Sequence, residues 1–305
     1  MMHLFDNHNH SQFSFDGKRS SVEECAYAAQ SAGLSGMAFT DHCDFFVPAM
    51  KASYENLVPE VFDVPAQQEE IDRVQALIDK DGGALKLLKG IEIGMHENHH
   101  DDIRRTLAEN SFDQVIASVH YLDGIDPFYG GYYEDKDWKQ AYGHYLETIH
   151  TEMTWLRDFD IMGHFDYVVR YAPYPEACLR YRDFSDILDE MFRFIIHEGK
   201  ALEINTKSYQ EYKGRPVTLD TDVLIRYKEL GGEIVSLGSD SHDPSRVGHG
   251  FARFAQLLKS LGFRWSAHYE KRKLASFRYN RIYSICQNGR SSSSRGALYA
   301  PALAA

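Results

Sequence analysis

Histidine and carboxylate side chains recur in short motifs of this sequence, and these residue types commonly hold divalent metal ions. The first motif is His8-Asn9-His10, in which two imidazoles stand two positions apart. In extended backbone, residues i and i+2 point to the same side, so both rings can reach one ion. Histidine pairs at this spacing are also common on protein surfaces, and the motif alone is weak evidence for a metal site.

Further motifs with the same residue types each follow an apolar run that is typical of a buried strand. Taken singly, each has an ordinary explanation, because a loop histidine can simply form hydrogen bonds and a strand-end aspartate often caps a helix. The motifs are Thr40-Asp41-His42, Glu92 after residues 87–91, Ser118-Val119-His120, Gly163-His164-Phe165-Asp166 and Ser239-Asp240-Ser241-His242.

The elements that must position these motifs alternate between strands and helices. Ser21-Val22-Glu23-Glu24 matches a capping box and predicts a helix that ends near Gly33. Short apolar runs predict strands at residues 2–6, 36–39, 85–93, 114–119, 160–163, 201–204 and 233–237, with a last one near 276–282. Helical spacing predicts helices at residues 65–80, 137–159, 185–199, 219–230 and 251–260. This alternation predicts an α/β fold with a parallel barrel related to the eight-unit β/α barrel.

A parallel barrel brings the carboxyl ends of all its strands to one face, where the motifs would meet. So many titratable groups without a counter-ion would repel one another and resist desolvation, and metal ions supply the compensating charge. Imidazole and carboxylate ligands suit Zn, Mn or Fe, whereas calcium prefers oxygen ligands. Clustered metal ions activate water and neutralise phosphoryl oxygens. The sequence therefore predicts a polynuclear metallophosphatase.

The ordered motifs resemble those of the polymerase and histidinol phosphatase (PHP) superfamily, and most closely its histidinol-phosphatases of histidine biosynthesis. The resemblance runs from about His3 to about Asn280. It implies a distorted (β/α)7 barrel with three divalent metal ions at the C-terminal ends of the strands. It also implies hydrolysis of L-histidinol phosphate to L-histidinol and phosphate.

The resemblance assigns ligands to three ions. One ion would be held by His8, His10, Glu92 and Asp240, and Glu92 would bridge to a second ion held by His120 and His164. The third would be held by Asp16, His42 and His242. Asp16 lies in Phe15-Asp16-Gly17, where a turn explains the aspartate equally well.

The phosphate also needs cationic partners. Arg170 resembles the family's phosphate-binding arginine, and its planar fork suits a phosphate. Asn205 and Lys207 follow the run 201–204 and are candidate substrate contacts. The expected catalytic residues are His42, Glu92, Asp240 and Arg170, whereas no residue stands out as the acid that protonates the leaving group.

Alternative functions remain open at this level. An amidohydrolase barrel also opens with HxH, but it commonly uses a carbamylated lysine bridge, where this chain has Glu92. A phosphotyrosine-protein phosphatase, a nucleotide-directed phosphoesterase and a non-catalytic metal-binding module are further alternatives. His96-Glu97-Asn98-His99-His100 matches the zinc-protease motif HExxH, which requires a helix. Because it directly follows a predicted strand, we expect a histidine-rich turn.

Bulk properties narrow the class of protein. The chain has 305 residues and a net charge of −12, which disfavours nucleic-acid and membrane partners but permits a small phosphorylated substrate. We expect a cytoplasmic enzyme without a signal peptide and with free cysteines. Residues 1–285 are predicted to form one catalytic domain, residues 286–305 a disordered tail, and residues 123–136 a long loop over the site. The oligomeric state is not predicted.

Overall fold

Parallel strands form a nearly closed barrel at the centre of the molecule, in a computed structural model that describes residues 4–45 and 60–278. The strands follow the order β1 (Phe5–Asp6), β2 (Gly36–Phe39), β4 (Lys86–Gly94), β5 (Gln114–Ser118), β6 (Ile161–Met162), β7 (Ala201–Asn205) and β8 (Val235–Gly238). Each pairs in parallel with the next, and β3 (His42–Cys43) continues the direction of β2 along β4. This arrangement confirms the distorted (β/α)7 barrel.

The first and last barrel strands meet through backbone contacts. The amide of Asn7 donates to the carbonyl of Leu237 at 2.9 Å, and Asn9 forms a parallel bridge with Ser241. Asp240 donates its backbone N–H to the carbonyl of His8 at 2.8 Å. These contacts bring the first and last predicted metal motifs together, although more than 200 residues separate them along the chain.

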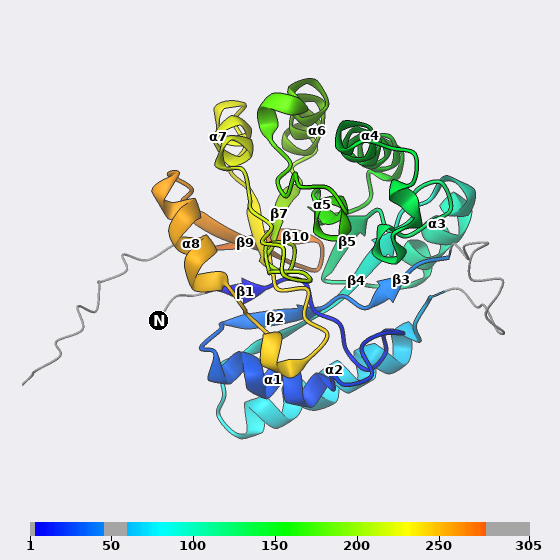
Figure 1. Cartoon of the computed structure of the whole chain (residues 1–305). Coiled ribbons are helices and arrows are strands. Elements are labelled where there is room, and N and C mark those ends of the chain that lie inside the picture. The colour runs from blue at the N-terminus through cyan, green and yellow to red at the C-terminus, as the bar shows by residue number, and fades with distance from the viewer. Residues whose placement is uncertain (1–3, 46–59, 279–305) are drawn as a thin grey trace, which may run out of the picture.

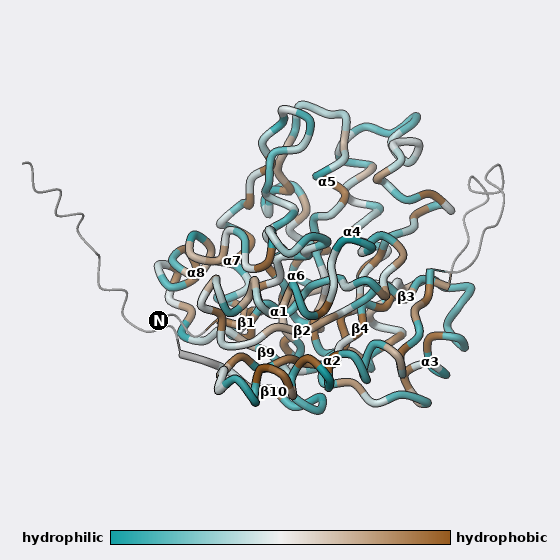
Figure 2. Tube along the Cα trace, turned by 90° about the horizontal axis from the view of Figure 1, so that it is seen from below, coloured by the Kyte–Doolittle hydropathy of each residue, from teal (hydrophilic) through white to brown (hydrophobic). Residues whose placement is uncertain are grey.

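Helices surround the strands (Figure 1). The six predicted helices are present with small shifts of their ends, and two short or highly charged helices were not predicted, α3 and α5. The helices are α1 (Val22–Ser31), α2 (Val64–Lys80), α3 (His100–Glu109), α4 (Trp138–Leu156), α5 (Tyr167–Tyr171), α6 (Ser185–His197), α7 (Thr221–Glu229) and α8 (Phe251–Ser260). Short 3₁₀ turns occupy Glu97–His99, Pro127–Tyr129, Gly131–Tyr133, Tyr181–Asp183 and Pro244–Arg246. Figure 2 shows hydrophobic stretches of the chain in the layer that contains β1, β2 and β4.

Local sequence explains why the helices begin where they do. Ser21 accepts a hydrogen bond from the amide of Glu24, as the capping motif predicts, although the Glu24 carboxylate returns to the Ser21 hydroxyl rather than to its amide. α3 was not predicted because most of its residues are charged or polar, and only Ile103 and Leu107 face the core.

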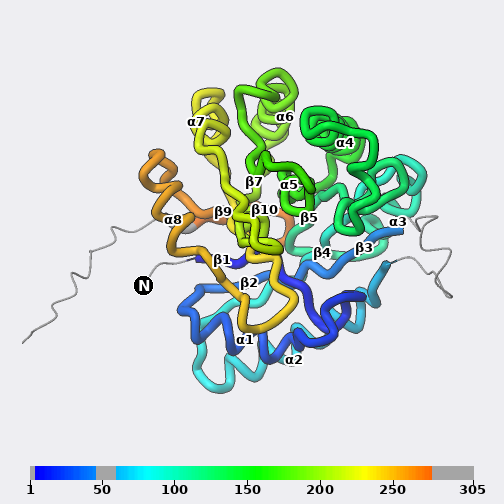
Figure 3. Tube along the Cα trace, viewed as in Figure 1, coloured from blue at the N-terminus to red at the C-terminus, as the bar shows by residue number. Residues whose placement is uncertain are grey.

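An antiparallel hairpin, β9 (Trp265–Glu270) and β10 (Lys273–Arg278), covers the N-terminal end of the barrel. The predicted last strand overlaps β10 but is not a barrel strand, and its residues 279–282 lie outside the described residues. The Asn7 side chain donates to the carbonyl of Ala267 at 3.0 Å, and Figure 3 shows the blue start of the chain beside the orange hairpin. Arg272 pairs with Asp160, which stands at the start of β6, at 2.5 Å.

The predicted tail at residues 286–305 lies outside the described residues. Among the helices that the structure describes, none combines the length and the apolar character that crossing a membrane requires.

Candidate metal centre

The carboxyl ends of the barrel strands place the predicted ligands in one buried cluster. His8 and His10 follow β1, His42 lies in β3 and Glu92 lies near the end of β4, where it pairs in register with His42. The remaining predicted ligands follow β5, β6 and β8, namely His120, His164, Asp240 and His242. Asp16 reaches the cluster from the loop after β1.

Glu92 lies at the middle of the cluster and is fully buried. Its Oε2 atom is 3.1 Å from His8 Nε2 and 3.0 Å from His42 Nδ1. Its Oε1 atom is 3.2 Å from His120 Nε2 and 3.0 Å from His164 Nε2. The two oxygens thus face different imidazole pairs, which is the arrangement that a carboxylate bridging two metal ions needs.

Two further carboxylates, those of Asp16 and Asp240, lie beside the imidazoles of the cluster. Asp16 Oδ2 lies 2.7 Å from His242 Nε2 and 3.7 Å from His42 Nε2. Asp240 Oδ1 lies 3.3 Å from His10 Nε2 and 3.4 Å from His242 Nδ1. The turn interpretation of Asp16 is therefore incomplete, because its carboxylate also faces the cluster.

Among the residues that the structure describes, three overlapping groups have donor atoms close enough to hold a metal ion. In each group these atoms lie within 4.8 Å of one another. The groups are His10, Asp16, His42 and His242; then His8, His10 and Glu92; and finally His42, Glu92 and His120.

Buried polar atoms that form no hydrogen bond support the same conclusion. His8 Nε2, His10 Nε2, His42 Nδ1 and Glu92 Oε2 are inaccessible to solvent and have no hydrogen-bond partner among the described residues. These atoms face one another at ion-pair distance without forming a hydrogen bond, and such an arrangement of buried polar atoms favours an additional group among them. Nitrogen and carboxylate donors of this kind suit a zinc-like divalent ion.

Electrostatics within the metal-free cluster favour opposite charges on neighbouring groups. Burial raises the pKa of Glu92, but the imidazoles of His8, His120 and His42 outweigh this and hold it well below its usual value. Burial lowers the pKa of His8, but Glu92, Glu203 and Asp240 raise it well above the usual value. In the metal-free protein His8 therefore favours its positively charged form, whereas burial and the charges of His242 and His42 hold the pKa of His10 well below its usual value.

Two buried carboxylates that sequence reasoning missed orient the predicted ligands. Glu203 Oε1 lies 2.7 Å from His8 Nδ1, and its Oε2 accepts the backbone N–H of His164 at 2.7 Å. Asp44 lies 3.1 Å from His120 Nδ1. Outer carboxylates of this type fix the tautomer and orientation of a ligating imidazole. A glutamate inside the apolar run 201–204 was the available signal for Glu203.

The predicted phosphate-binding residues adjoin this cluster. Arg170 and Lys207 line a cavity of about 310 Å³ together with His42, His120 and Asp240. The Arg170 guanidinium is held by the backbone carbonyl of Lys207 and lies 5.4 Å from the centre of the Tyr212 ring.

Lys207 and Asn205 both contact Asp240. Lys207 Nζ lies 3.0 Å from Asp240 Oδ1, and the Asn205 amide donates to Asp240 Oδ2 at 3.2 Å. Asn205 is buried and also accepts the backbone N–H of Lys207 at 3.1 Å. The structure thus places Asn205 behind Asp240 and not on the wall of the cavity.

Asp240 itself has a φ of 48°, in the left-handed region that non-glycine residues seldom adopt. Strained conformations of this kind persist where surrounding structure holds them and cluster at functional sites. Here the backbone bond to His8 and the side-chain bond from Asn205 hold Asp240 in place.

The predicted loop 123–136 divides into two parts. Asp126, Phe128 and Tyr129 line the cavity, and the two aromatic rings are about half exposed. Tyr132 and Tyr133 are buried, and their hydroxyls donate to backbone carbonyls of Ala141 and Val168. The buried tyrosines therefore anchor the loop, and only its first part borders the site.

The HExxH sequence does not form a zinc-protease helix. His96 precedes the 3₁₀ turn Glu97–His99, and α3 begins only at His100. The metal-capable groups among the described residues include none of these histidines. The interpretation as a histidine-rich turn agrees with this geometry.

Comparisons with known proteins agree on one family. Residues 6–207 match the family model described as "PHP domain". A histidinol-phosphatase of Lactococcus lactis subsp. lactis is 33% identical over 90% of this chain and 97% of its own length. A probable histidinol-phosphatase of Clostridium acetobutylicum is 29% identical over 88% of this chain and 98% of its own length.

Solved structures resemble this barrel. The crystal structure of a Lactococcus lactis histidinol phosphate phosphatase, complexed with zinc, L-histidinol and phosphate, matches with a TM-score of 0.78 at 29% identity. The match covers 90% of this chain and all of that chain. A putative histidinol phosphatase of Listeria monocytogenes shares the fold, with a TM-score of 0.64 at 20% identity over 82% of this chain and 99% of that one.

Proposed function

The chain belongs to the PHP domain family, and on this premise we propose that it is a metal-dependent histidinol-phosphatase. It hydrolyses the phosphomonoester L-histidinol phosphate to L-histidinol and phosphate, a step of histidine biosynthesis. The observation that carries this function is the buried Glu92 carboxylate, whose two oxygens face four imidazoles beside a cavity lined by Arg170 and Lys207.

We assign three divalent ions to this cluster, and the zinc in the Lactococcus lactis structure favours zinc. His8, His10, Glu92 and Asp240 would hold the first ion, and Glu92, His120 and His164 the second. Asp16, His42 and His242 would hold the third, in agreement with one of the close donor groups. When bound, such ions lower the pKa of water and neutralise charge on phosphoryl oxygens.

The residues of this chain supply binding and orientation. Arg170 offers a planar pair of donors to the phosphate, and its contacts with the carbonyl of Lys207 and the ring of Tyr212 hold it ready for the substrate. Lys207 adds a second positive charge beside Asp240, which stabilises the charge on the transferring phosphoryl group. Asn205 acts through Asp240, which it positions.

The cavity suits a small substrate. Its volume of about 310 Å³ is at the lower end of the range for small-molecule sites. The net charge of −12 supports a small phosphorylated molecule over nucleic acid as the partner, and it gives no reason to expect membrane binding. We place the enzyme in the cytoplasm, where a biosynthetic activity of this kind operates.

A substrate panel tests the function. We expect zinc-loaded protein to turn over histidinol phosphate with a higher kcat/KM than p-nitrophenyl phosphate or a phosphotyrosine peptide. Chelation should abolish turnover, and added zinc should restore it. Preference for the phosphotyrosine peptide would support a protein phosphatase, and absence of turnover with zinc, manganese and iron would support a binding module.

The Glu92→Gln variant tests the site. The neutral amide keeps the shape but removes the bridging charge, so we expect a loss of metal content together with at least about a hundredfold loss of kcat. Glu109→Gln, an exposed change at the end of α3, is the matched control. Full metal content and full turnover in Glu92→Gln would refute the assignment.

A further inference from the structure

The cavity at the candidate metal centre has one carboxylate to which the proposed reaction gives no role. The carboxylates among its described lining residues are those of Asp16, Asp44, Glu60, Asp126 and Asp240. Asp16 and Asp240 are proposed metal ligands, and Asp44 orients His120. Glu60 accepts the hydroxyl of Tyr121 at 3.0 Å. Asp126 remains, and it lies at the start of the loop that borders the cavity.

The hydrogen bonds of Asp126 come from neutral groups alone. Its Oδ1 atom accepts the backbone N–H of Phe128 at 2.8 Å and the hydroxyl of Tyr167 at 2.9 Å. Its Oδ2 atom forms no hydrogen bond, and the carboxylate forms no ion pair, with any residue that the structure describes. Asp126 is partly buried, and burial raises its pKa, so its charged form gains from a cation placed beside Oδ2.

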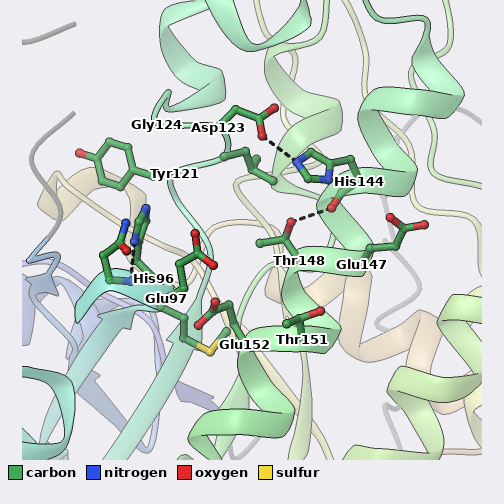
Figure 4. Close-up of a pocket in the computed structure, with 13 residues that line it drawn as sticks. His96, Glu97, Tyr121, Asp123, Gly124, His144, Glu147, Thr148, Thr151 and Glu152 are labelled. Carbon is green, nitrogen blue, oxygen red and sulfur yellow. Dashed lines mark hydrogen bonds and ion pairs between the residues drawn. The ribbon is translucent and has the colours of Figure 1, made fainter. Parts of the chain in front are cut away.

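A second aspartate of the same loop shows the opposite arrangement. Asp123 lies 3.1 Å from Nε2 of His144 in α4, a contact that Figure 4 shows, and its other oxygen is 3.3 Å from Lys136 Nζ. Its charge is therefore balanced by groups of the protein. Asp126, three positions later, lines the cavity and has no such partner among the described residues.

A row of tyrosine rings connects Asp126 with the predicted phosphate-binding arginine. The Tyr167 ring, whose hydroxyl donates to Asp126, lies 4.9 Å from the Tyr171 ring, which lies 5.0 Å from the Tyr212 ring. The Arg170 guanidinium is 5.8 Å from the centre of the Tyr171 ring and 5.4 Å from that of Tyr212. All five residues line the cavity. Its wall thus has a negative group toward one end and a positive group toward the other.

Tyr167 also places Asp126 close to the metal centre. The centre of its ring lies 5.0 Å from that of His164 and 5.9 Å from that of His120. A single side chain therefore separates the Asp126 carboxylate from two predicted metal ligands. A phosphomonoester held by its phosphate at this centre can extend its leaving group along the same wall toward Asp126.

We propose that Asp126 is a substrate-binding residue that selects phosphomonoesters with an ammonium group on the leaving group, which Oδ2 binds. This inference rests on the proposed function, because L-histidinol phosphate carries such a group on the carbon next to its ester carbon. Phosphomonoesters without a cationic group, such as p-nitrophenyl phosphate, lack this contact. Asp126 takes no part in bond cleavage, so its loss should raise KM more than it lowers kcat.

The Asp126→Asn variant tests this role, since asparagine keeps an oxygen for the bonds from Phe128 and Tyr167 but removes the charge. The substrates are L-histidinol phosphate and 3-(imidazol-4-yl)propyl phosphate, which has the same chain without the ammonium group. We expect KM for histidinol phosphate to rise roughly tenfold or more, because one partner of a desolvated charge pair is lost. By the same reasoning, KM for the deaminated ester should change less than about twofold.

Asp135→Asn is the matched control, because it makes the same change at an exposed position of the same loop outside the cavity. It should leave KM for both esters unchanged, and zinc content and thermal unfolding verify that both variants fold. Equal losses of Asp126→Asn on the two esters would show that Asp126 acts through the fold or the metal centre, and would overturn the proposal. An unchanged KM for histidinol phosphate would overturn it equally.

Product binding separates this inference from the proposed function. Isothermal titration of L-histidinol into the zinc-loaded full chain, saturated with inorganic phosphate, requires no turnover. Asp126→Asn should bind L-histidinol roughly tenfold more weakly than the unmodified chain, and the deaminated alcohol equally well. If the unmodified chain hydrolyses neither ester, the proposed function fails and this titration decides on Asp126. Equal affinity of both chains for L-histidinol would then overturn the assignment.

Discussion

At the scale of single residues, the candidate metal centre depends on carboxylates that stand behind the predicted ligands as much as on the ligands. Glu203 contacts His8 through one oxygen and the backbone of His164 through the other. It thereby sets which nitrogen of His8 faces Glu92, because the Nδ1 atom is already engaged. One buried side chain thus orients parts of two motifs that are far apart in sequence.

Glu203→Gln should weaken zinc binding about 10- to 100-fold, since outer partners of ligating histidines typically have effects of this size. The amide keeps the volume of the side chain but cannot accept hydrogen bonds through both of its terminal atoms. Zinc affinity by competition with a chromogenic chelator measures the effect. Zinc affinity equal to that of the unmodified chain would contradict the orienting role.

Zinc affinity should also depend on pH. Burial lowers the pKa of His120, but Asp44 and Glu92 raise it well above its usual value in the metal-free protein, and His8 is raised likewise. Below these raised pKa values the imidazoles are protonated, so a metal ion must displace protons and its apparent affinity falls as the pH falls. Titrations at about pH 6, about pH 7 and about pH 8, in buffers of different ionisation enthalpy, should show affinity rising with pH together with proton release. Zinc binding without proton release would contradict the raised pKa values of His8 and His120.

At the scale of elements, the strands must approach one another closely where the ligands emerge. Gly238 ends β8, and a Cβ atom at this position would lie 2.2 Å from Glu203 Oε1 and 2.5 Å from His8 Cβ. No side chain fits there without displacing the strand of His8 or the carboxylate that orients it. The absence of a side chain at Gly238 is thus part of how β1, β7 and β8 converge.

Gly238→Ala should therefore impair both folding and the metal centre. We expect a loss of about 1–3 kcal/mol in the free energy of unfolding, as for other insertions into packed interiors, and a lower zinc content. Gly143→Ala in α4 is the control, because the nearest atom to a Cβ there is 3.6 Å away and alanine favours helix. Denaturant titration and elemental analysis measure the two effects; unchanged stability and zinc content in Gly238→Ala would contradict this packing argument.

At the scale of the whole molecule, the two ends of the barrel have different tasks. The carboxyl end holds the candidate metal centre, and the hairpin β9–β10 covers the other end. Arg272 attaches the hairpin to the barrel by pairing with Asp160 and, at 2.9 Å, with Asp158. Burial raises the pKa of Asp160, and Arg272 counteracts this shift, so the arginine supports a carboxylate that would otherwise be poorly solvated.

Arg272→Ala should lower stability and leave the catalytic constants nearly unchanged. Removing one partner leaves the largely buried Asp160 carboxylate without its cation, at a cost of about 1–3 kcal/mol. A decrease in Tm with an unchanged kcat/KM for histidinol phosphate is the expected result. Arg264→Ala, at an exposed position just before the hairpin, should change neither quantity. An equal Tm for both variants would show that the hairpin is held by other contacts.

Most barrel strands and the motifs at their ends were readable from the chain, because strand periodicity and metal-ligand chemistry are local properties. The ends of β2 and α8 agree with the predicted ranges, and β4 and β5 differ by a residue at their ends. The hairpin was less readable, since its role depends on surfaces contributed by β8, β1 and β5.

The candidate site divides in the same way. Ligand types are visible in sequence, because HxH, Glu and DxH patterns carry their chemistry with them. The residues that orient those ligands are not visible in sequence, because they lie far away along the chain. Glu203 contacts His8 across 195 positions, and Asp44 contacts His120 across 76 positions. The convergence of Glu92 with four imidazoles and the placement of Asn205 behind Asp240 likewise arise from contacts between distant segments. Local patterns predict which residues can do chemistry, whereas packing of the barrel sets which atoms meet.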